Sequence, residues 1–512
     1  MEVGKLKKPK KKDKKIATSI KKKNKDIKTA KCFSRCAVTL TVISIIVAAV
    51  AYHVYTEVLH IPELPAVDLD VWWGPNHTKH SQDTAIRPFR IVFSDAMQEQ
   101  LVKKFDHHRR LDKHKSFDDT AWTYGVHSSA REQIFSFWQY KYKIKERERF
   151  FNQFHHFKTN VQGLDLHFMR VRPEVENVKA LPIILLHGWP NSFREFYDAA
   201  PLLTTQRSDY DFVFEVIVPS LPGFGFSQGA VRPGLGPFQV AIVMRNLMNR
   251  LGFNKYYVHG GDFGHVIGSI MATLFPNEVL GFHSNMPLTL AKPLVFGRVL
   301  GAVWPTFVDA HHWRKMYPLK EKIEILIEET GYSHLQATKP DTIGIALNES
   351  PVGLATYIFD KIMIFTDANN KYLEDGGLAK YYNDSMTDLI DNVMVYWVSE
   401  SITTSMRIYK EVSSVELTLE QIPTSVPTWF LCLNNESFYN PEILLRWKYP
   451  NLIDTTTYDD YGGNFAALKR PQQLADDVFY ACNAPAGLAV ANLRRQDAAG
   501  AALSHNSHKS RN

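Results

Sequence analysis

Short apolar runs alternate with amphipathic stretches through the middle of the chain. Uninterrupted β-rich runs that end in Gly and Pro predict buried strands in LPIILLHGWP (181–190) and DFVFEVIVPSLPGFGFS (211–227). The sequence FQVAIVMRNLMNRLGF (238–253) has helical periodicity, and KYYVHGGDFGHVIGSIMATLFP (255–276) predicts a strand, a tight turn and a helix. Strands that alternate with helices predict the α/β class, with a parallel sheet and helices on both faces.

The flanking regions follow other patterns. Residues 85–175 are polar and aromatic, with helical stretches such as SDAMQEQLVKKFDHHRRL (94–111). Residues 290–415 are typical of helices and predict a helical insertion, after which VPTWFLCL (426–433) and TTTYDDYGG (455–463) return to strands. The Ala/Gly-rich polar sequence after Cys482 predicts a disordered tail.

The N-terminus combines a basic run with an apolar one. Residues 1–35 hold fourteen lysines and predict a solvated, disordered segment, while AVTLTVISIIVAAVAYHV (37–54) is 18 residues without a formal charge. That length is close to the ~20 residues that span a bilayer. A cleaved signal peptide and a buried core helix are the alternatives, but a signal usually has a shorter apolar core. We therefore predict a transmembrane anchor at 36–55, in contact with membrane lipid.

The charge distribution and the cysteines bear on three kinds of function: nucleic-acid binding, metal binding and disulfide formation. The formal charge of the 512 residues is +7, yet residues 1–35 alone carry +12, so the remainder is net −5. This balance gives no support to a nucleic-acid-binding body. The four cysteines have no metal-ligand spacing and predict neither a metal site nor a disulfide framework. Cys32 and Cys36, beside the apolar run, are either acylated or, as we favour, unmodified thiols.

The sequence HGGDFGHV (259–266) carries the strongest chemical signal. A small residue on either side of a nucleophile, between strand and helix, is the pattern of a nucleophile elbow, and the central residue here is Asp262. A carboxylate there excludes serine-type acylation and attacks sp³ carbon to form an alkyl-enzyme ester. The backbone N–H groups of Trp189, in the upstream HGWP loop, and of Phe263 are the predicted oxyanion hole. His187 is predicted to be a structural loop residue.

From about residue 71 to 479 the chain resembles the microsomal epoxide hydrolases, which include the insect juvenile hormone epoxide hydrolases. The resemblance rests on HFKTNVQGLDLHF, HGWPNSFREFY, PSLPGFGFS, GGDFG, TKPDTIGIALNESPVGLA, YLEDGGL and RWKYPNLI. It implies an α/β-hydrolase core with a helical lid, an N-terminal meander and no cofactor. The expected parts are a basic segment (1–35), an anchor (36–55), an N-terminal extension (70–178), a core (179–290 and 415–482), a lid (291–414) and a tail (483–512).

The resemblance also implies roles for individual residues. The nucleophile falls on Asp262, and the two lid tyrosines that donate to the epoxide oxygen fall on Tyr332 in GYSHLQ and Tyr409 in MRIYKE. The charge-relay acid falls on Glu436 in LNNESFYNPE. The position of the general-base histidine, between GG and FAA, is occupied by Asn464.

Asn464 is the main departure from the family pattern. An amide accepts no proton near neutral pH, whereas imidazole does, so ester formation is expected to proceed and ester hydrolysis to be slow or absent. Phe263 stands where the family has Trp and keeps the backbone donor, and His265 stands where a small residue is common. Other histidines that could replace this base, but are not expected to serve, are His265, His283, His311 and His312.

The leading hypothesis is therefore an epoxide hydrolase that acts on small lipophilic epoxides, with turnover impaired at position 464. A catalytically inactive protein that binds epoxides or lipids is the second hypothesis. Haloalkane dehalogenation also uses an Asp nucleophile, but paired tyrosines favour an epoxide. The resemblance implies a single-pass protein of the endoplasmic reticulum membrane, in xenobiotic or juvenile hormone metabolism. The lysine run favours a luminal body and the resemblance a cytosolic one, so the side stays open, as do the particular epoxide and the oligomeric state.

Overall fold

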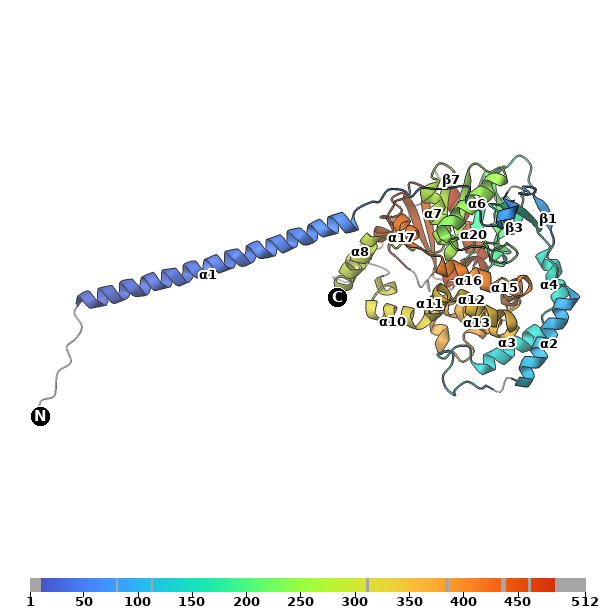
Figure 1. Cartoon of the computed structure of the whole chain (residues 1–512), viewed down its shortest axis with the longest axis horizontal. Helices are drawn as coiled ribbons and strands as arrows, with labels where there is room; N and C mark the ends of the chain where they lie inside the picture. The colour runs from blue at the N-terminus through green and yellow to red at the C-terminus, as the bar shows by residue number, and fades with distance from the viewer. Residues whose placement is uncertain are drawn as a thin grey trace, which may run out of the picture. The chain divides into compact units, whose positions relative to one another are not determined.

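The computed structural model describes residues 11–79, 82–111, 114–309, 313–382, 386–433, 439–458 and 462–483. Contacts divide the chain into one unit at residues 1–61 and a second at 62–512. The first unit contains a long helix, α1 (Lys11–His53), and a π-helical turn, η1 (Val54–Val58). The second unit contains the sheet and its covering helices (Figure 1).

The helix of the first unit is longer than the sequence predicts. Residues 11–35, expected to be disordered, are helical and continue into the apolar run, while residues 1–10 lie outside the described part. Neither Pro nor Gly occurs between Pro9 and Pro62, and Lys and Ala are good helix formers. Its segment Ala37–Val58 is the one described helix long and apolar enough to cross a membrane, judged by length and composition.

The second unit is built on a nine-stranded sheet, counted over the described residues. Its spatial order is β1-β2-β3-β5-β4-β6-β7-β8-β9. The strands are β1 (Arg87–Phe89), β2 (His155–Val161), β3 (Leu164–Val171), β4 (Lys179–Leu186), β5 (Phe212–Pro219), β6 (Tyr256–Gly260), β7 (Val279–Ser284), β8 (Thr428–Leu433) and β9 (Leu452–Tyr458).

The sheet is mixed: the predicted strands β4, β5 and β6 pair parallel as expected, and an antiparallel edge is added to them. The pairings from β5 through β9 are parallel, whereas β1, β2 and β3 pair antiparallel and join the edge at β5. Central strands such as β8 are buried at every position, as expected when both faces are covered. The covering helices are α5 (Ala199–Thr204) with α20 (Pro471–Cys482), and α6 (Pro237–Arg250) with α7 (Phe263–Leu274).

Helices also fill the predicted insertion between β7 and β8, which confirms its helical character. They are α8 (Lys292–Val303), α9 (Pro305–Val308), α10 (Leu319–Glu329), α11 (Gly331–Thr338), α12 (Pro340–Glu349), α13 (Pro351–Thr366), α14 (Leu378–Tyr382), α15 (Met386–Ser399), α16 (Ile402–Lys410) and α17 (Ser414–Glu420). The helices α2 (Asp95–Leu111), α3 (Ser128–Tyr140) and α4 (Ile144–Phe151) lie between β1 and β2 in the sequence, and α2 and α3 pack against α13 and α15 (Figure 1).

A buried carboxylate joins three parts of the second unit. The Oδ1 atom of Asp391, on α15, accepts hydrogen bonds from the Tyr142 hydroxyl at 2.7 Å and from Arg147 Nε at 2.9 Å. Its Oδ2 atom accepts from Arg194 Nε at 3.1 Å, in the loop that follows β4. Breaking such a buried pair leaves an uncompensated charge, so this cluster fixes α15 and the loop after β4 relative to each other.

Candidate active site

The turn between β6 and α7 holds Asp262 in a conformation that side chains rarely adopt. Its φ is 52° and its ψ −128°. A Cβ atom on Gly260 would lie 2.2 Å from the carbonyl oxygen of Gly264, and one on Gly264 would lie 1.9 Å from that of Leu186. Glycine at both positions therefore permits the sharp turn, which presents Asp262 at the carboxyl end of a parallel strand.

Two backbone N–H groups point at the Asp262 carboxylate. The Trp189 N–H donates to Oδ1 at 2.9 Å, and the Phe263 N–H also bonds the carboxylate. The loop comes this close because Gly188 has no side chain: a Cβ there would lie 2.2 Å from the same Oδ1. Burial raises the pKa of Asp262 to about 6, although both N–H groups act to lower it. The two N–H groups expected to form an oxyanion hole thus already face the carboxyl group.

Tyr332, on α11, and Tyr409, on α16, meet above Asp262. Their ring centroids are 5.9 Å apart, and their hydroxyls are hydrogen-bonded to each other. Burial raises the pKa of both phenols above the ordinary value, and the Asp262 charge raises both further. Both tyrosines therefore keep their protons across the neutral range and are available as donors.

Aromatic rings line the space around these phenols. The Trp189 ring stacks on Tyr332 at 5.1 Å, and Phe263 meets Tyr409 edge-on at 4.7 Å. One helical turn after Tyr332, Gln336 bonds the Tyr357 hydroxyl through Nε2. Over the described residues, the Trp189 Nε1 and Gln336 Oε1 atoms are buried without a hydrogen-bond partner. The surroundings of the two phenols are therefore mainly aromatic, as is common in small-molecule sites.

Asn464 lies in a buried turn that is linked to the elbow. It belongs to η6 (Gly463–Phe465) and is 8% exposed. Its carbonyl oxygen accepts from Asn285 Nδ2 at 3.1 Å, and a Cβ on Gly261 would lie 2.5 Å from Asn285 Oδ1. Asn285 therefore bridges the turn that holds Asn464 and the turn that holds Asp262. The expected acid, Glu436, lies outside the described residues.

The described histidines weighed as replacement bases are engaged elsewhere. His265 lies 2.9 Å from Ser284 Oγ through Nδ1 and 3.3 Å from the Tyr449 hydroxyl through Nε2, and burial lowers its pKa to about 4. His283 contacts Asp477 at 2.8 Å and the His259 ring at 2.8 Å. Both ring nitrogens of each imidazole are therefore occupied by other side chains. His311 and His312 lie outside the described residues.

His187 holds the loop after β4 in place. Its Nδ1 lies 3.1 Å from the Gly188 carbonyl oxygen, and its Nε2 accepts the Leu221 N–H at 3.1 Å. Burial lowers its pKa to about 4, so the ring is neutral at pH 7. This geometry agrees with the structural role that the sequence predicts for it.

Glu195 is a carboxyl group that sequence reasoning missed. It is buried, accepts a hydrogen bond from Asn191 Nδ2, and lies in η3 (Phe193–Phe196), which packs against the helix that follows Asn464. Burial raises its pKa well above the ordinary value, and the Asp262 charge raises it further. The available signal was an acid between aromatic residues, FREFY, since an acid in apolar surroundings is a candidate proton acceptor.

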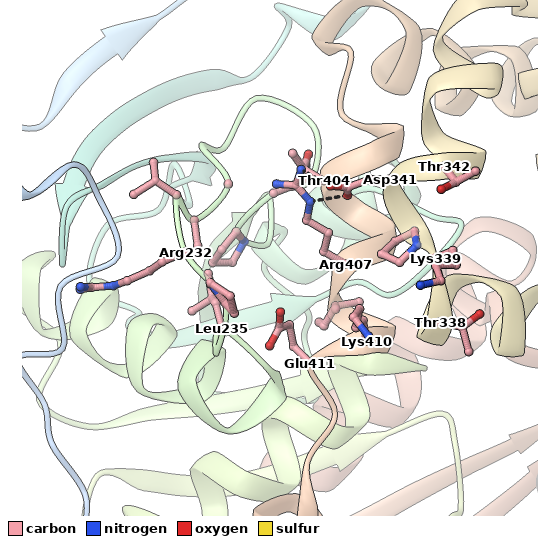
Figure 2. Close-up of a pocket in the computed structure, with 18 residues that line it drawn as sticks. Arg232, Leu235, Thr338, Lys339, Asp341, Thr342, Thr404, Arg407, Lys410 and Glu411 are labelled. Atoms are coloured by element: carbon pink, nitrogen blue, oxygen red, sulfur yellow. Dashed lines mark hydrogen bonds and ion pairs between the residues drawn. The ribbon is translucent and has the colours of Figure 1, made fainter.

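A surface groove of about 540 Å³ lies apart from this site. Arg407 and Asp341, which both line it, form an ion pair at 2.7 and 3.0 Å (Figure 2). Its lining includes neighbours of Tyr409 on α16, but neither Tyr409 nor Asp262. The groove therefore lies outside the cluster around Asp262. No group of three or more His, Cys, Asp or Glu side chains placed to hold a metal occurs in the described part of the chain.

A mixed sheet with an aspartate at the strand–helix elbow and a helical insertion over it defines an α/β-hydrolase. A family model described as the epoxide hydrolase N terminus matches residues 86–196, and one for the alpha/beta hydrolase fold matches residues 182–311. The juvenile hormone epoxide hydrolase of Bombyx mori is 46% identical over 429 residues, which cover 82% of this chain and 91% of that one. Epoxide hydrolase 1 of Oryctolagus cuniculus is 39% identical and covers 80% and 91%.

The solved structures agree with these similarities. The crystal structure of juvenile hormone epoxide hydrolase from Bombyx mori matches with a TM-score of 0.79 and 45% identity, over 81% of this chain and 98% of that one. The epoxide hydrolase of Aspergillus niger matches with a TM-score of 0.61 and 25% identity, over 79% and 97%. The chain belongs to the epoxide hydrolase family.

Proposed function

We propose that this chain opens small lipophilic epoxides through an ester on Asp262, and that Asn464 slows or stops the hydrolysis of that ester. The observation that carries the proposal is the convergence of a carboxylate, two backbone N–H groups and two phenols in one aromatic-lined site. Each of these groups fits the first half-reaction. The second half-reaction needs a base that an amide at position 464 does not supply.

In the first half-reaction, an Asp262 oxygen attacks an epoxide carbon and the carbon–oxygen bond of the ring breaks. The released alkoxide takes a proton from Tyr332 or Tyr409, whose hydroxyls are hydrogen-bonded to each other. A phenol can donate to an alkoxide because the alkoxide is far more basic. The product is a β-hydroxy ester on Asp262 with a tyrosinate beside it. No step so far involves position 464.

In the second half-reaction, water attacks the carbonyl carbon of the ester. The bond between that carbon and the alkyl oxygen breaks, and the diol leaves with this oxygen. The N–H groups of Trp189 and Phe263 are positioned to bind the oxyanion that forms. The attacking water must lose a proton near neutral pH, the task of the histidine in the family pattern. Loss of a general base typically slows a step by ~10² to 10⁴. We propose that the ester therefore accumulates.

Ester formation should depend on pH through Asp262. Because the ionised carboxylate is the nucleophile and its pKa is about 6, the single-turnover rate should fall about tenfold per pH unit below that value and level off above it. The raised pKa of each tyrosine predicts no loss of rate up to about pH 9. Rapid-quench mass spectrometry of the adduct measures this profile. A rate that is constant from about pH 5 to about pH 8 would contradict the assignment.

Removal of both phenols should slow ring opening. We expect Tyr332→Phe with Tyr409→Phe to reduce the single-turnover rate by ~10² to 10⁴, and each single change to cost less, since one donor remains. The matched control is Tyr140→Phe, which removes an exposed hydroxyl that bonds Arg109. Adduct formation by the double variant at the wild-type rate would show that the phenols are not the proton donors.

A catalytically inactive binder is the second candidate, favoured by the amide at position 464. It would hold an epoxide or another lipophilic molecule in the same aromatic space. Adduct formation separates the two candidates, because a binder leaves Asp262 unmodified.

The proposed location is the endoplasmic reticulum membrane, with one span. The support is the apolar helix segment Ala37–Val58, of mean hydropathy 2.2, none of which is buried. Its length matches the ~20 residues that cross a bilayer.

A further inference from the structure

Helix α8, the first helix after β7, exposes an apolar face to the surface, while its Arg298 turns inward. Exposed side chains recur at spacings of one and four residues along one face: Val295, Phe296, Val299, Leu300, Val303 and Trp304, called here the α8 face. Val303 is 88% exposed and Trp304 64%. A surface helix of a globular protein normally has the opposite arrangement.

The inner side of α8 explains its orientation. A Cβ on Gly297 would lie 2.5 Å from the Leu444 side chain, so the helix packs closely there. Arg298 turns inward and donates from Nη2 to Asn440 Oδ1 at 2.8 Å and to the Tyr439 carbonyl at 3.3 Å. Arg298 is also the only formally charged residue between Pro293 and Val308. The outer face therefore contains no charge from Val295 to Trp304, and the exposed Lys292 lies at its N-terminal end.

We propose that the α8 face inserts into the surface of a lipid bilayer. An uncharged apolar helix face with a Trp at its end is typical of helices that lie in the membrane interface. The same chain supplies a second lipid-directed feature, the apolar segment Ala37–Val58. Thirteen residues, 59–71, separate that segment from Trp72, the first buried hydrophobic residue of the second unit. At ~3.5 Å per residue they reach at most ~45 Å, so a tethered body stays close to the bilayer.

A lipid surface fits the α8 face better than a second copy of the chain. The twelve residues of α8 extend about 18 Å, and the exposed stripe is one helix wide. A stable protein interface usually buries ~800 Å² per partner, more than such a stripe offers. A separate cavity of about 190 Å³ is lined by Leu290, two residues before α8, and by Phe263, but by no residue of α8.

Vesicle flotation of residues 62–512 tests the proposal. All buried hydrophobic residues of the described part lie at or after Trp72, so this unit keeps its whole core without the first one. We expect the unit to float with phosphatidylcholine vesicles, and Val299→Glu with Val303→Glu to weaken binding at least about tenfold. Val102→Glu, on the exposed side of α2 at the far end of the same unit in Figure 1, is the matched control and should bind like wild type.

The outcomes either support or overturn the proposal. Both Val299 and Val303 are exposed, so the double variant should melt at the wild-type temperature, and its loss of flotation then reports lipid contact. Brominated phosphatidylcholine should quench tryptophan emission, and Trp304→Phe should remove most of that quenching. Absence of wild-type flotation, or equal flotation of the Glu variant, would overturn the proposal. A lipid-independent dimer in ultracentrifugation that the Glu variant dissociates would assign the α8 face to a second copy instead.

Discussion

Asn464→His is expected to raise steady-state diol release by ~10² to 10⁴ over the wild-type chain, the usual contribution of a general base. The reason is specific to the second half-reaction. Imidazole has an ordinary pKa of ~6.5 and accepts a proton from water near neutral pH, which an amide does not. Position 464 lies in a buried turn, and Asn285 connects the backbone of that turn to the elbow at Gly261. The measurement is diol formed per protein over many minutes.

The rate of adduct formation is the internal control for this experiment. Ring opening does not involve position 464, so the single-turnover rate should be the same in both proteins. Asn464→Gln is the matched variant, since it keeps the amide and should give no gain. Equal diol release by wild type and Asn464→His would contradict the proposed impairment.

Glu195 supplies the competing explanation if the wild type turns over. It is a buried carboxyl group whose pKa is raised by burial and also by the Asp262 charge. In that case Glu195→Gln should abolish diol release and let the ester accumulate, while ring opening continues. If Glu195→Gln changes neither diol release nor adduct yield, Glu195 takes no part in deprotonating the water.

Asp262→Asn is expected to abolish covalent capture of the epoxide. The amide keeps the size of the side chain and tolerates the positive φ of 52° better than most residues. It lacks the anionic oxygen that attacks carbon, and loss of a nucleophile typically costs ~10⁴-fold or more. Intact-mass spectrometry after incubation with a small lipophilic epoxide measures the adduct.

The control for Asp262→Asn is its own mass. Deamidation would restore aspartate and add about one dalton, which separates a reverted fraction from a variant that truly reacts. If the Asp262→Asn protein that has not deamidated forms an adduct at the wild-type rate, and the adduct maps to another residue, Asp262 is not the nucleophile. Retained binding of the epoxide without reaction would agree with it.

Strands β4, β5, β6, β8 and β9 were predicted from the sequence, whereas β7 and the antiparallel edge strands β1, β2 and β3 were not. The apolar runs at 181–190, 211–227 and 426–433 correspond to β4, β5 and β8, because strands buried on both faces read as continuous apolar segments. The β2–β3 hairpin was missed. Its two-residue turn is Gln162-Gly163, with φ of 51° and 84°, and Gln is an unusual first residue for a turn that requires positive φ twice.

The site shows a similar division. Asp262 and the loop at Trp189 carry local signals, a glycine-flanked elbow and a Gly-Pro turn after a strand, and the structure brings them together. Tyr332 and Tyr409 have no local signal, since their helices meet only through tertiary packing, and the family resemblance was needed to select them. Glu195 was missed because its character depends on burial, which one sequence does not display.

The central claim is that hydrolysis of the ester on Asp262 stalls, and a single incubation tests it most directly. The full-length wild-type protein is incubated with an excess of a small lipophilic epoxide, and the intact mass of the protein and the amount of diol are measured together. We expect a persistent adduct that maps to Asp262, with at most one diol per protein. Many diols per protein without a lasting adduct would contradict the claim and show that a base other than the missing histidine completes the reaction.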